Sequence, residues 1–245
     1  MDHLAYQAQI RQLFTETVSG PENRLDLGRA ALFIAGEAYP GLDILRYVAK
    51  LEAMAAAVRP GVTTTDAPIL KIAHLNTYLF EEWGFRGNTQ EYYDPRNSFL
   101  NDVIDRRLGI PITLSVVYME VGRRVGMPLQ GVGMPGHFIM KYADPEEDIY
   151  IDPFSKGRIL SREACEELLQ DVYGEPVPFH ETFLAPVSKK QILSRMLMNL
   201  KAIYIHTKDY LKALSVVERQ LIIQPDTEQE VKDRAALRNL IGMLN

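Results

Sequence analysis

Residues 92–142 read YYDPRNSFLNDVIDRRLGIPITLSVVYMEVGRRVGMPLQGVGMPGHFIMKY, and after an acidic turn residues 149–154 read IYIDPF. Apolar residues recur after Pro111, which suits the first position of a helix, and Gly126-Met127-Pro128 ends this helix near Val125. Short runs of β-branched and aromatic residues then predict antiparallel strands at 129–134, 138–142 and 149–154, with a fourth fragment at 158–160. We therefore expect an α+β core in which a helix packs on an antiparallel sheet.

Two polar residues lie on neighbouring strands of this predicted sheet. His137 follows Pro135-Gly136, and the glycine leaves room for a substrate backbone to approach. Asp152 stands between apolar residues on the next strand, and a buried carboxylate needs a partner. Taken singly, a histidine placed like His137 more often has a structural role, and an aspartate followed by proline, like Asp152, more often caps a turn. Their order on consecutive strands after a helix favours an oriented His–Asp pair, as in the frame of a papain-type catalytic site.

The nucleophile of such a site is expected near the start of the helix, around Ser115, and no cysteine stands there. A cysteine at that position would ionise beside a helix N-terminus and a histidine, whereas a serine hydroxyl stays protonated without a strong base. Thr113 is the rival for the position, and a helix serine bonded to the backbone is the structural alternative. Asn97 upstream would donate to an oxyanion or hold a turn. Cys165 lies among carboxylates that raise a thiol pKa, so we do not expect catalysis there.

Bulk composition excludes several classes of function. The 245 residues are 47% apolar and 24% charged with a net charge of −5, so no basic surface points to nucleic acid or to an anionic membrane. The single cysteine excludes an internal disulfide framework, the N-terminus lacks a signal or membrane helix, and we expect a cytoplasmic protein. The five histidines are scattered without a metal-binding spacing, and the glycines at 131–136 lie between strands, so we expect neither a metal nor a dinucleotide cofactor.

Three segments are expected along the chain. Residues 1–90 predict a scaffold of four helices, residues 91–185 the core, and residues 186–245 further helices after a loop rich in proline, glycine and aromatic residues. Over residues 194–227 the last segment has the apolar, aromatic, small and proline positions of a tetratricopeptide repeat, and a second repeat begins near Ala235 and stops early. A plain helical hairpin is the alternative. Since a repeat needs a neighbour, either the chain is part of a longer array or the repeat packs on the N-terminal segment.

The segments 93–101 and 106–112, together with Pro-Gly-His-Phe at 135–138 and Ile-Asp-Pro-Phe at 151–154, resemble the SirB-type bacterial proteins over roughly residues 25–245. That family joins a transglutaminase-like domain to tetratricopeptide repeats, and the resemblance implies a papain-like α+β fold. Transglutaminase-like enzymes use Cys, His and Asp. By position, the resemblance implies that His137 and Asp152 of this chain correspond to the catalytic His and Asp, and that Ser115 stands in the place of the cysteine.

Two functions remain open from the sequence. In the first, the chain has lost cysteine chemistry and is a binding or regulatory module whose groove holds a peptide or amide and whose repeat docks a protein partner. In the second, Ser115, His137 and Asp152 form an active hydrolase or acyl-transferase, with Asn97 at the oxyanion site. The second requires the Ser115 hydroxyl within about 3 Å of a His137 nitrogen. An apolar edge on the unfinished repeat would suit a partner or a homodimer; its residues are Leu237, Leu240, Ile241 and Leu244.

Overall fold

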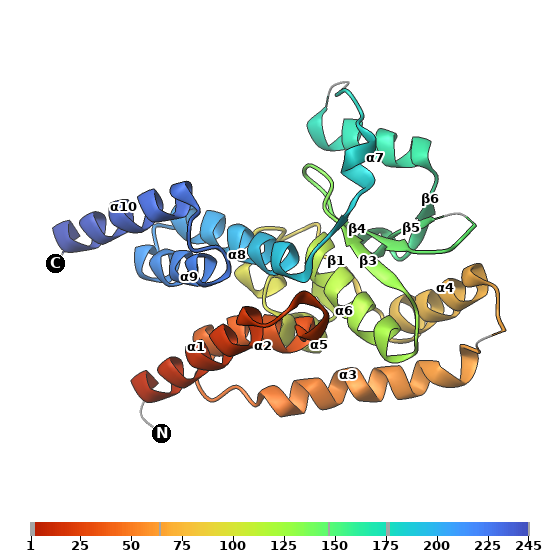
Figure 1. Ribbon diagram of the computed structural model, residues 1–245, viewed down its shortest axis with the longest axis horizontal. Coiled ribbons are helices and arrows are strands. Elements are labelled where there is room, and N and C mark those ends of the chain that lie inside the picture. Colours follow the sequence, from red (N-terminus) through yellow and green to blue (C-terminus); the bar gives the residue numbers. More distant parts are fainter. Residues whose placement is uncertain (1–2, 64, 147, 175–176, 245) are drawn as a thin grey trace.

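The computed structural model describes residues 3–63, 65–146, 148–174 and 177–244, and Figure 1 shows its arrangement. The structure combines helices with an antiparallel sheet, which confirms the expected α+β class, and the helices from the two ends of the chain pack on each other beside the sheet. The start of the first expected helix and part of the proline-rich loop fall outside the described residues. No described helix has the length and apolar character needed to cross a membrane.

The N-terminal helices form where apolar periodicity predicts them. Asp26 and Asp43 cap the second and third helices by accepting hydrogen bonds from the backbone N–H three residues on, at 2.9 and 3.0 Å. The fourth helix changes to a π-helix at Thr77 instead of continuing as an α-helix. The elements are α1 (His3–Ser19), α2 (Leu27–Ala38), α3 (Ile44–Val58) and α4 (Pro68–Asn76) with its π-helical extension (Thr77–Glu82).

The core is built from a five-stranded antiparallel sheet and the helix that precedes it. The strand order is β6-β5-β4-β3-β7. The first and third strands end earlier than expected, because the chain turns into Gly133 after β3 and because Asp152-Pro153 starts a 3-10 helix. The elements are α5 (Leu100–Arg106), α6 (Pro111–Arg124), β3 (Leu129–Val132), β4 (Ile139–Tyr142), β5 (Ile149–Asp152), β6 (Arg158–Leu160) and α7 (Arg162–Tyr173).

Three very short strands were not anticipated from the sequence. Strand β7 (Pro186–Val187) pairs with β3 at the sheet edge, after the loop that we expected to be irregular. Strands β1 (Arg86–Gly87) and β2 (Leu108–Gly109) form a separate parallel pair. Two residues carry too little periodicity for any pattern to predict a strand.

Both faces of the sheet are covered, and this explains why its strands are apolar on both sides. Phe138, Met140 and Tyr142 belong to the main core with α6, whereas Ile139 belongs to a smaller core with Cys165 and Leu169 of α7. Successive side chains of β4 therefore point to opposite helices. In Figure 1, α6 and α7 lie on opposite sides of these strands.

The C-terminal helices pack on the N-terminal helices. Helix α8 (Lys189–His206) contacts α2 and α6, α9 (Tyr210–Ile223) contacts α1 and α8, and α10 (Glu228–Leu244) contacts α9. One apolar core runs through all three segments, from Ile10 to Leu237. Of the expected apolar edge, Leu237 is buried while Leu240 and Leu244 are 41% and 72% exposed.

Candidate functional site

His137 and Asp152 meet at neighbouring strands. His137 precedes β4 after Gly136, whose φ of +70° belongs to the left-handed region that glycine adopts without strain. Asp152 ends β5, which pairs with β4. The Nε2 atom of His137 lies 3.2 Å from Oδ1 of Asp152. Nε2 makes no hydrogen bond of good geometry, so the contact is close but not well aligned, as is common in sites without a bound ligand.

Asp152 is held firmly by its own strand end. Its side chain is nearly inaccessible, and it accepts hydrogen bonds from the Phe154 backbone N–H at 2.9 Å and the Ser155 hydroxyl at 2.7 Å. Burial alone raises the pKa of Asp152, but the hydrogen bonds and the neighbouring His137 outweigh it and lower the pKa. Asp152 is therefore an ionised carboxylate that fixes the histidine ring.

His137 opens into a pocket of about 150 Å³. The pocket is formed where the start of α6 meets the Gly136–Phe138 turn and helix α8. Asp152 is not among the lining residues. The lining residues are Tyr92, Ile110, Pro111, Ile112, Gly136, His137, Phe138, Arg195 and Asn199.

The structure places Ser115 outside this lining. Ser115 is completely buried, and its hydroxyl donates a hydrogen bond to the Pro111 carbonyl oxygen at 2.8 Å. Pro111, one helical turn earlier, occupies the pocket wall on the same face of the helix. The rival Thr113 is also buried, and its hydroxyl donates to the Asn97 carbonyl at 2.7 Å. Neither hydroxyl is presented to His137.

Asn97 has the structural role that the sequence left open. It is fully buried, and its amide nitrogen donates to the carbonyl oxygens of Glu91 and Tyr92 at 2.6 and 3.2 Å. Its amide oxygen accepts from Asn88 at 3.1 Å and from Arg106 at 3.3 Å. All of these contacts stabilise the loop that carries Tyr92 to the pocket, and none is directed at His137.

Sequence reasoning missed two residues of the pocket, Arg195 and Asn199. Both come from α8, 58 or more residues after His137, and a helical spacing of four places them on one face. Arg195 donates to the carbonyl oxygens of Met134 and His137 at 2.9 and 2.8 Å. It therefore fixes the turn that carries the histidine. The one available signal was that both polar residues lie in a largely apolar stretch of α8, residues 192–200.

An aromatic wall continues the site outward. The His137 ring meets Phe154 edge-on with centroids 6.1 Å apart, Phe154 meets Tyr92 at 6.2 Å, and Tyr92 meets Tyr93 at 5.3 Å. Tyr93 is 78% exposed. The aromatic wall (Tyr92, Tyr93 and Phe154) leads from the surface to the histidine, and aromatic surfaces of this kind suit a peptide or another planar ligand.

Within the part of the chain that the structure describes, neither a cluster of metal ligands nor an accessible thiol accompanies the pair. Within the described residues, no group of three or more His, Cys, Asp and Glu side chains is placed to hold a metal ion. Cys165 is buried in the smaller core, and burial, with the charge of Asp152, raises its pKa to about 11. A thiol of that pKa is a poor nucleophile at neutral pH.

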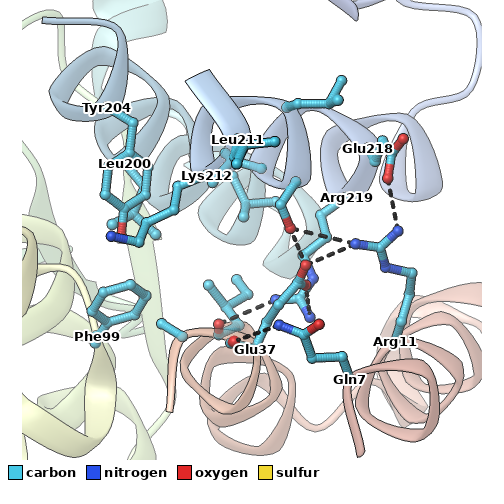
Figure 2. Close-up of a pocket in the computed structure, with 16 residues that line it drawn as sticks. Gln7, Arg11, Glu37, Phe99, Leu200, Tyr204, Leu211, Lys212, Glu218 and Arg219 are labelled. Atoms are coloured by element: carbon cyan, nitrogen blue, oxygen red, sulfur yellow. Dashed lines mark hydrogen bonds and ion pairs between the residues drawn. The ribbon is translucent and has the colours of Figure 1, made fainter. Parts of the chain in front are cut away.

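A second, larger cavity of about 440 Å³ shares no residue with the His137 pocket. It lies between α1 and α2 on one side and α8 and α9 on the other, and Figure 2 shows its polar end. There Glu37 binds Arg11, Ser215 and Arg219, and Arg11 also pairs with Glu218 at 2.7 Å. These charges satisfy one another. The cavity is larger than the His137 pocket, and within it the Nε atom of Arg219 is buried without a hydrogen-bond partner among the described residues.

Comparisons with known proteins identify relatives by sequence. A sequence model described as the transglutaminase-like superfamily matches residues 45–198. A UPF0162 protein of Xylella fastidiosa (strain 9a5c) is 37% identical over 225 residues, which cover 91% of this chain and 80% of the relative. A UPF0162 protein of Vibrio cholerae is 32% identical over 64% of this chain and 58% of its own length. Human F-box only protein 21 is 34% identical over 51% of this chain, which is 20% of that protein. No solved structure gives a significant match.

Proposed function

The chain belongs to the transglutaminase-like superfamily and to the family of UPF0162 proteins, and from this premise we propose that it binds a peptide without forming a covalent intermediate. In this proposal the pocket beside His137 keeps the shape of an amide-binding site, whereas the nucleophile is absent. The protein acts as a binding or regulatory module.

The observation that carries the proposal is the set of side chains at the start of α6. Ile110, Pro111 and Ile112 line the pocket, and none has a hydroxyl or a thiol. Ser115 is one turn deeper and donates its proton to the Pro111 carbonyl. An attack by Ser115 would require this hydrogen bond to break and the buried side chain to reach past Pro111. The His–Asp pair has nothing to activate on this helix.

A peptide fits the dimensions and the surroundings of the site. The pocket of about 150 Å³ is smaller than the roughly 300–1,000 Å³ typical of whole small-molecule sites, so it suits one side chain or one end of a longer ligand. The aromatic wall gives the rest of that ligand a surface on which to lie. We further propose that α8–α10, with the helix–turn–helix pattern of a tetratricopeptide repeat, dock a protein partner through the exposed end of α10, and that the protein is cytoplasmic.

One observation favours a hydrolase or acyl-transferase as the second candidate. Asp152 keeps its charge and lies 3.2 Å from Nε2 of His137, the arrangement by which a catalytic histidine is oriented. For this candidate Ser115 must attack, His137 act as base and Asp152 orient it. Asn97 cannot serve the oxyanion while its amide holds the loop of Tyr92.

The experiment that separates the two has two parts. A fluorophosphonate probe, which labels activated serines, is incubated with the protein and with Ser115→Ala, and labelling is located by peptide mapping. Binding is measured by selecting peptides from a random display library on the wild type and on Asn199→Trp, which fills the pocket. Met198→Trp, at a residue 52% exposed on the same helix, is the matched control.

We expect no label at Ser115 and a peptide family whose binding is lost in Asn199→Trp and kept in Met198→Trp. Labelling at Ser115 that Ser115→Ala abolishes would establish the hydrolase. A library that yields no peptide dependent on the pocket would refute the binding module.

A further inference from the structure

Arg195 is a half-buried arginine without a carboxylate partner in the described chain, whereas buried Arg219 and half-buried Arg124 and Arg11 each have one. Arg219 pairs with Glu37, Arg124 with Glu120 and Glu52, and Arg11 with Glu37 and Glu218. No ion pair within the described residues includes Arg195, and its recorded partners are the two carbonyl oxygens of Met134 and His137. The guanidinium also lies over the Phe138 ring, 5.6 Å from its centroid.

The charge of Arg195 is consequently uncompensated where it meets the pocket. Burial lowers the pKa of Arg195, because a partly buried cation is less well solvated than one in water. A guanidinium nevertheless remains protonated in proteins. Because charges that lose contact with water are ordinarily paired, the half-buried and unpaired guanidinium of Arg195 at the wall of an open pocket is positioned for a charge supplied from outside.

The rest of the lining has the same electrostatic preference. None of the lining residues is Asp or Glu, and Asp152, which contacts Nε2 of His137, is not part of the lining. Helix α6, which has 14 residues, begins at the pocket wall, so the positive end of its dipole is at the pocket. His137 is 7% exposed, and its Nε2 has no hydrogen-bond acceptor of good geometry. Asn199 adds an amide beside Arg195.

We propose that the His137 pocket is a carboxylate subsite, in which Arg195 and Asn199 of α8 bind an acidic group of the peptide. The inference rests on the proposed function, since the acidic group is part of that peptide. The source of the carboxylate is either a Glu or Asp side chain or the C-terminus of the peptide. Arg195 presents a planar pair of N–H donors that matches a carboxylate, and the turn of His137 holds the guanidinium in place.

The test uses three blocked amino acids that separate charge from shape. N-acetylglutamate N-methylamide supplies a side-chain carboxylate, N-acetylalanine a terminal one, and N-acetylglutamine N-methylamide the neutral isostere of the first. Each is titrated into the full chain at fixed ionic strength, and binding is followed by the NMR signals of the Arg195 side chain and of the Ile112 backbone N–H. The same titrations are run on Arg195→Gln, Arg195→Lys and the control Arg29→Gln, at an exposed arginine of α2.

We expect one of the two carboxylates to bind at least about tenfold more tightly than the glutamine compound, because a charge-assisted pair is lost with the amide. Arg195→Gln should abolish that preference, Arg195→Lys should keep part of it, and Arg29→Gln should leave it unchanged. The stronger of the two carboxylates identifies the source. The comparison of ligands on the wild type stands even if Arg195→Gln does not fold.

The outcomes distinguish this inference from the function on which it rests. Equal binding of the glutamate and glutamine compounds, or a preference that survives in Arg195→Gln, overturns the carboxylate subsite. If the display selection still yields peptides that need the pocket, and these lack acidic residues and a free C-terminus, the binding module stands and the subsite falls. Absence of shifts with all three compounds also overturns the subsite.

Discussion

The placement of a nucleophile on α6 can be tested by putting a cysteine at each of two positions. We predict that Pro111→Cys yields a reactive thiol and that Ser115→Cys yields an inert one. Pro111 lines the pocket beside His137 at the first turn of the helix, whereas Ser115 is completely buried one turn later. This reverses the expectation from the sequence, which placed the thiolate at 115.

The magnitude follows from the two environments. A helix N-terminus stabilises an anion by about 0.3–2 kcal/mol, or roughly 0.2–1.5 pKa units at 1.36 kcal/mol per unit. The Arg195 charge acts in the same direction. A thiol lowered from about 8.5 to about 7.5 is roughly 25% ionised at pH 7 instead of 3%, so alkylation should be about eightfold faster than for an ordinary cysteine. Cys165 shows what burial does instead, since its pKa is raised to about 11.

The assay is iodoacetamide alkylation against pH, with the modified residue located by peptide mapping. Cys165 is present in both variants and serves as the internal reference for a buried thiol. Circular dichroism melting of each variant checks that the fold is kept. Fast alkylation of Ser115→Cys with a midpoint below about 8.5, together with slow alkylation of Pro111→Cys, would show that the helix presents Ser115 to the site and would refute our assignment.

Four further results are expected. Asp152→Asn should lower the free energy of unfolding by about 2–3 kcal/mol in urea titrations, because the amide cannot accept from the Phe154 N–H and its other partners together; no change would mean that these bonds are not net stabilising. The pKa of Asp152 is lowered from 3.8 in the folded state, so its contribution to the free energy of unfolding is present above pH 3.8 and is lost as the pH falls through the folded pKa. The difference in stability between wild type and Asp152→Asn should therefore shrink on acidification. A constant difference would contradict the lowered pKa. Glu37→Gln should cost about 3–5 kcal/mol by leaving the nearly inaccessible Arg219 uncompensated, while the exposed control Glu81→Gln should stay within about 0.5 kcal/mol. A fragment that starts at Lys189 should be poorly folded or self-associating; a monomer that melts cooperatively by calorimetry would contradict this.

The sequence predicted the neighbouring positions of His137 and Asp152 better than the position of any nucleophile. Strand order is coded locally by alternating runs and turns, so two residues on consecutive antiparallel strands are brought together once the register is set. Local patterns do not predict in the same way which turn of a helix lies at a pocket. Residues 111 and 115 share a face, and apolar periodicity cannot say which of them reaches the pocket. That depends on where α6 meets the Gly136 turn.

The contribution of α8 lay outside the reach of such patterns. Arg195 reaches the site because α8 packs on α2 and α6, and this contact joins segments more than 60 residues apart. The fold expectation for the C-terminal helices was correct in secondary structure. The sequence left open whether these helices pack on the N-terminal segment, and they do, since one apolar core includes Leu193 and Leu197 of α8 together with Leu32 of α2.

This packing makes the pocket a property of the whole chain. Arg195 of α8 fixes the His137 turn, and α9, which packs on α8, is joined to α2 by the ion pair of Arg219 with Glu37. Any ligand that engages Arg195 stabilises the docked position of α8, and by reciprocity a partner that binds the docked C-terminal helices tightens the pocket. Removal of Glu37 should therefore weaken binding of the carboxylate compound without touching the pocket. Unchanged affinity of folded Glu37→Gln for the carboxylate compound would show that the Glu37–Arg219 pair and the Arg195 pocket act independently.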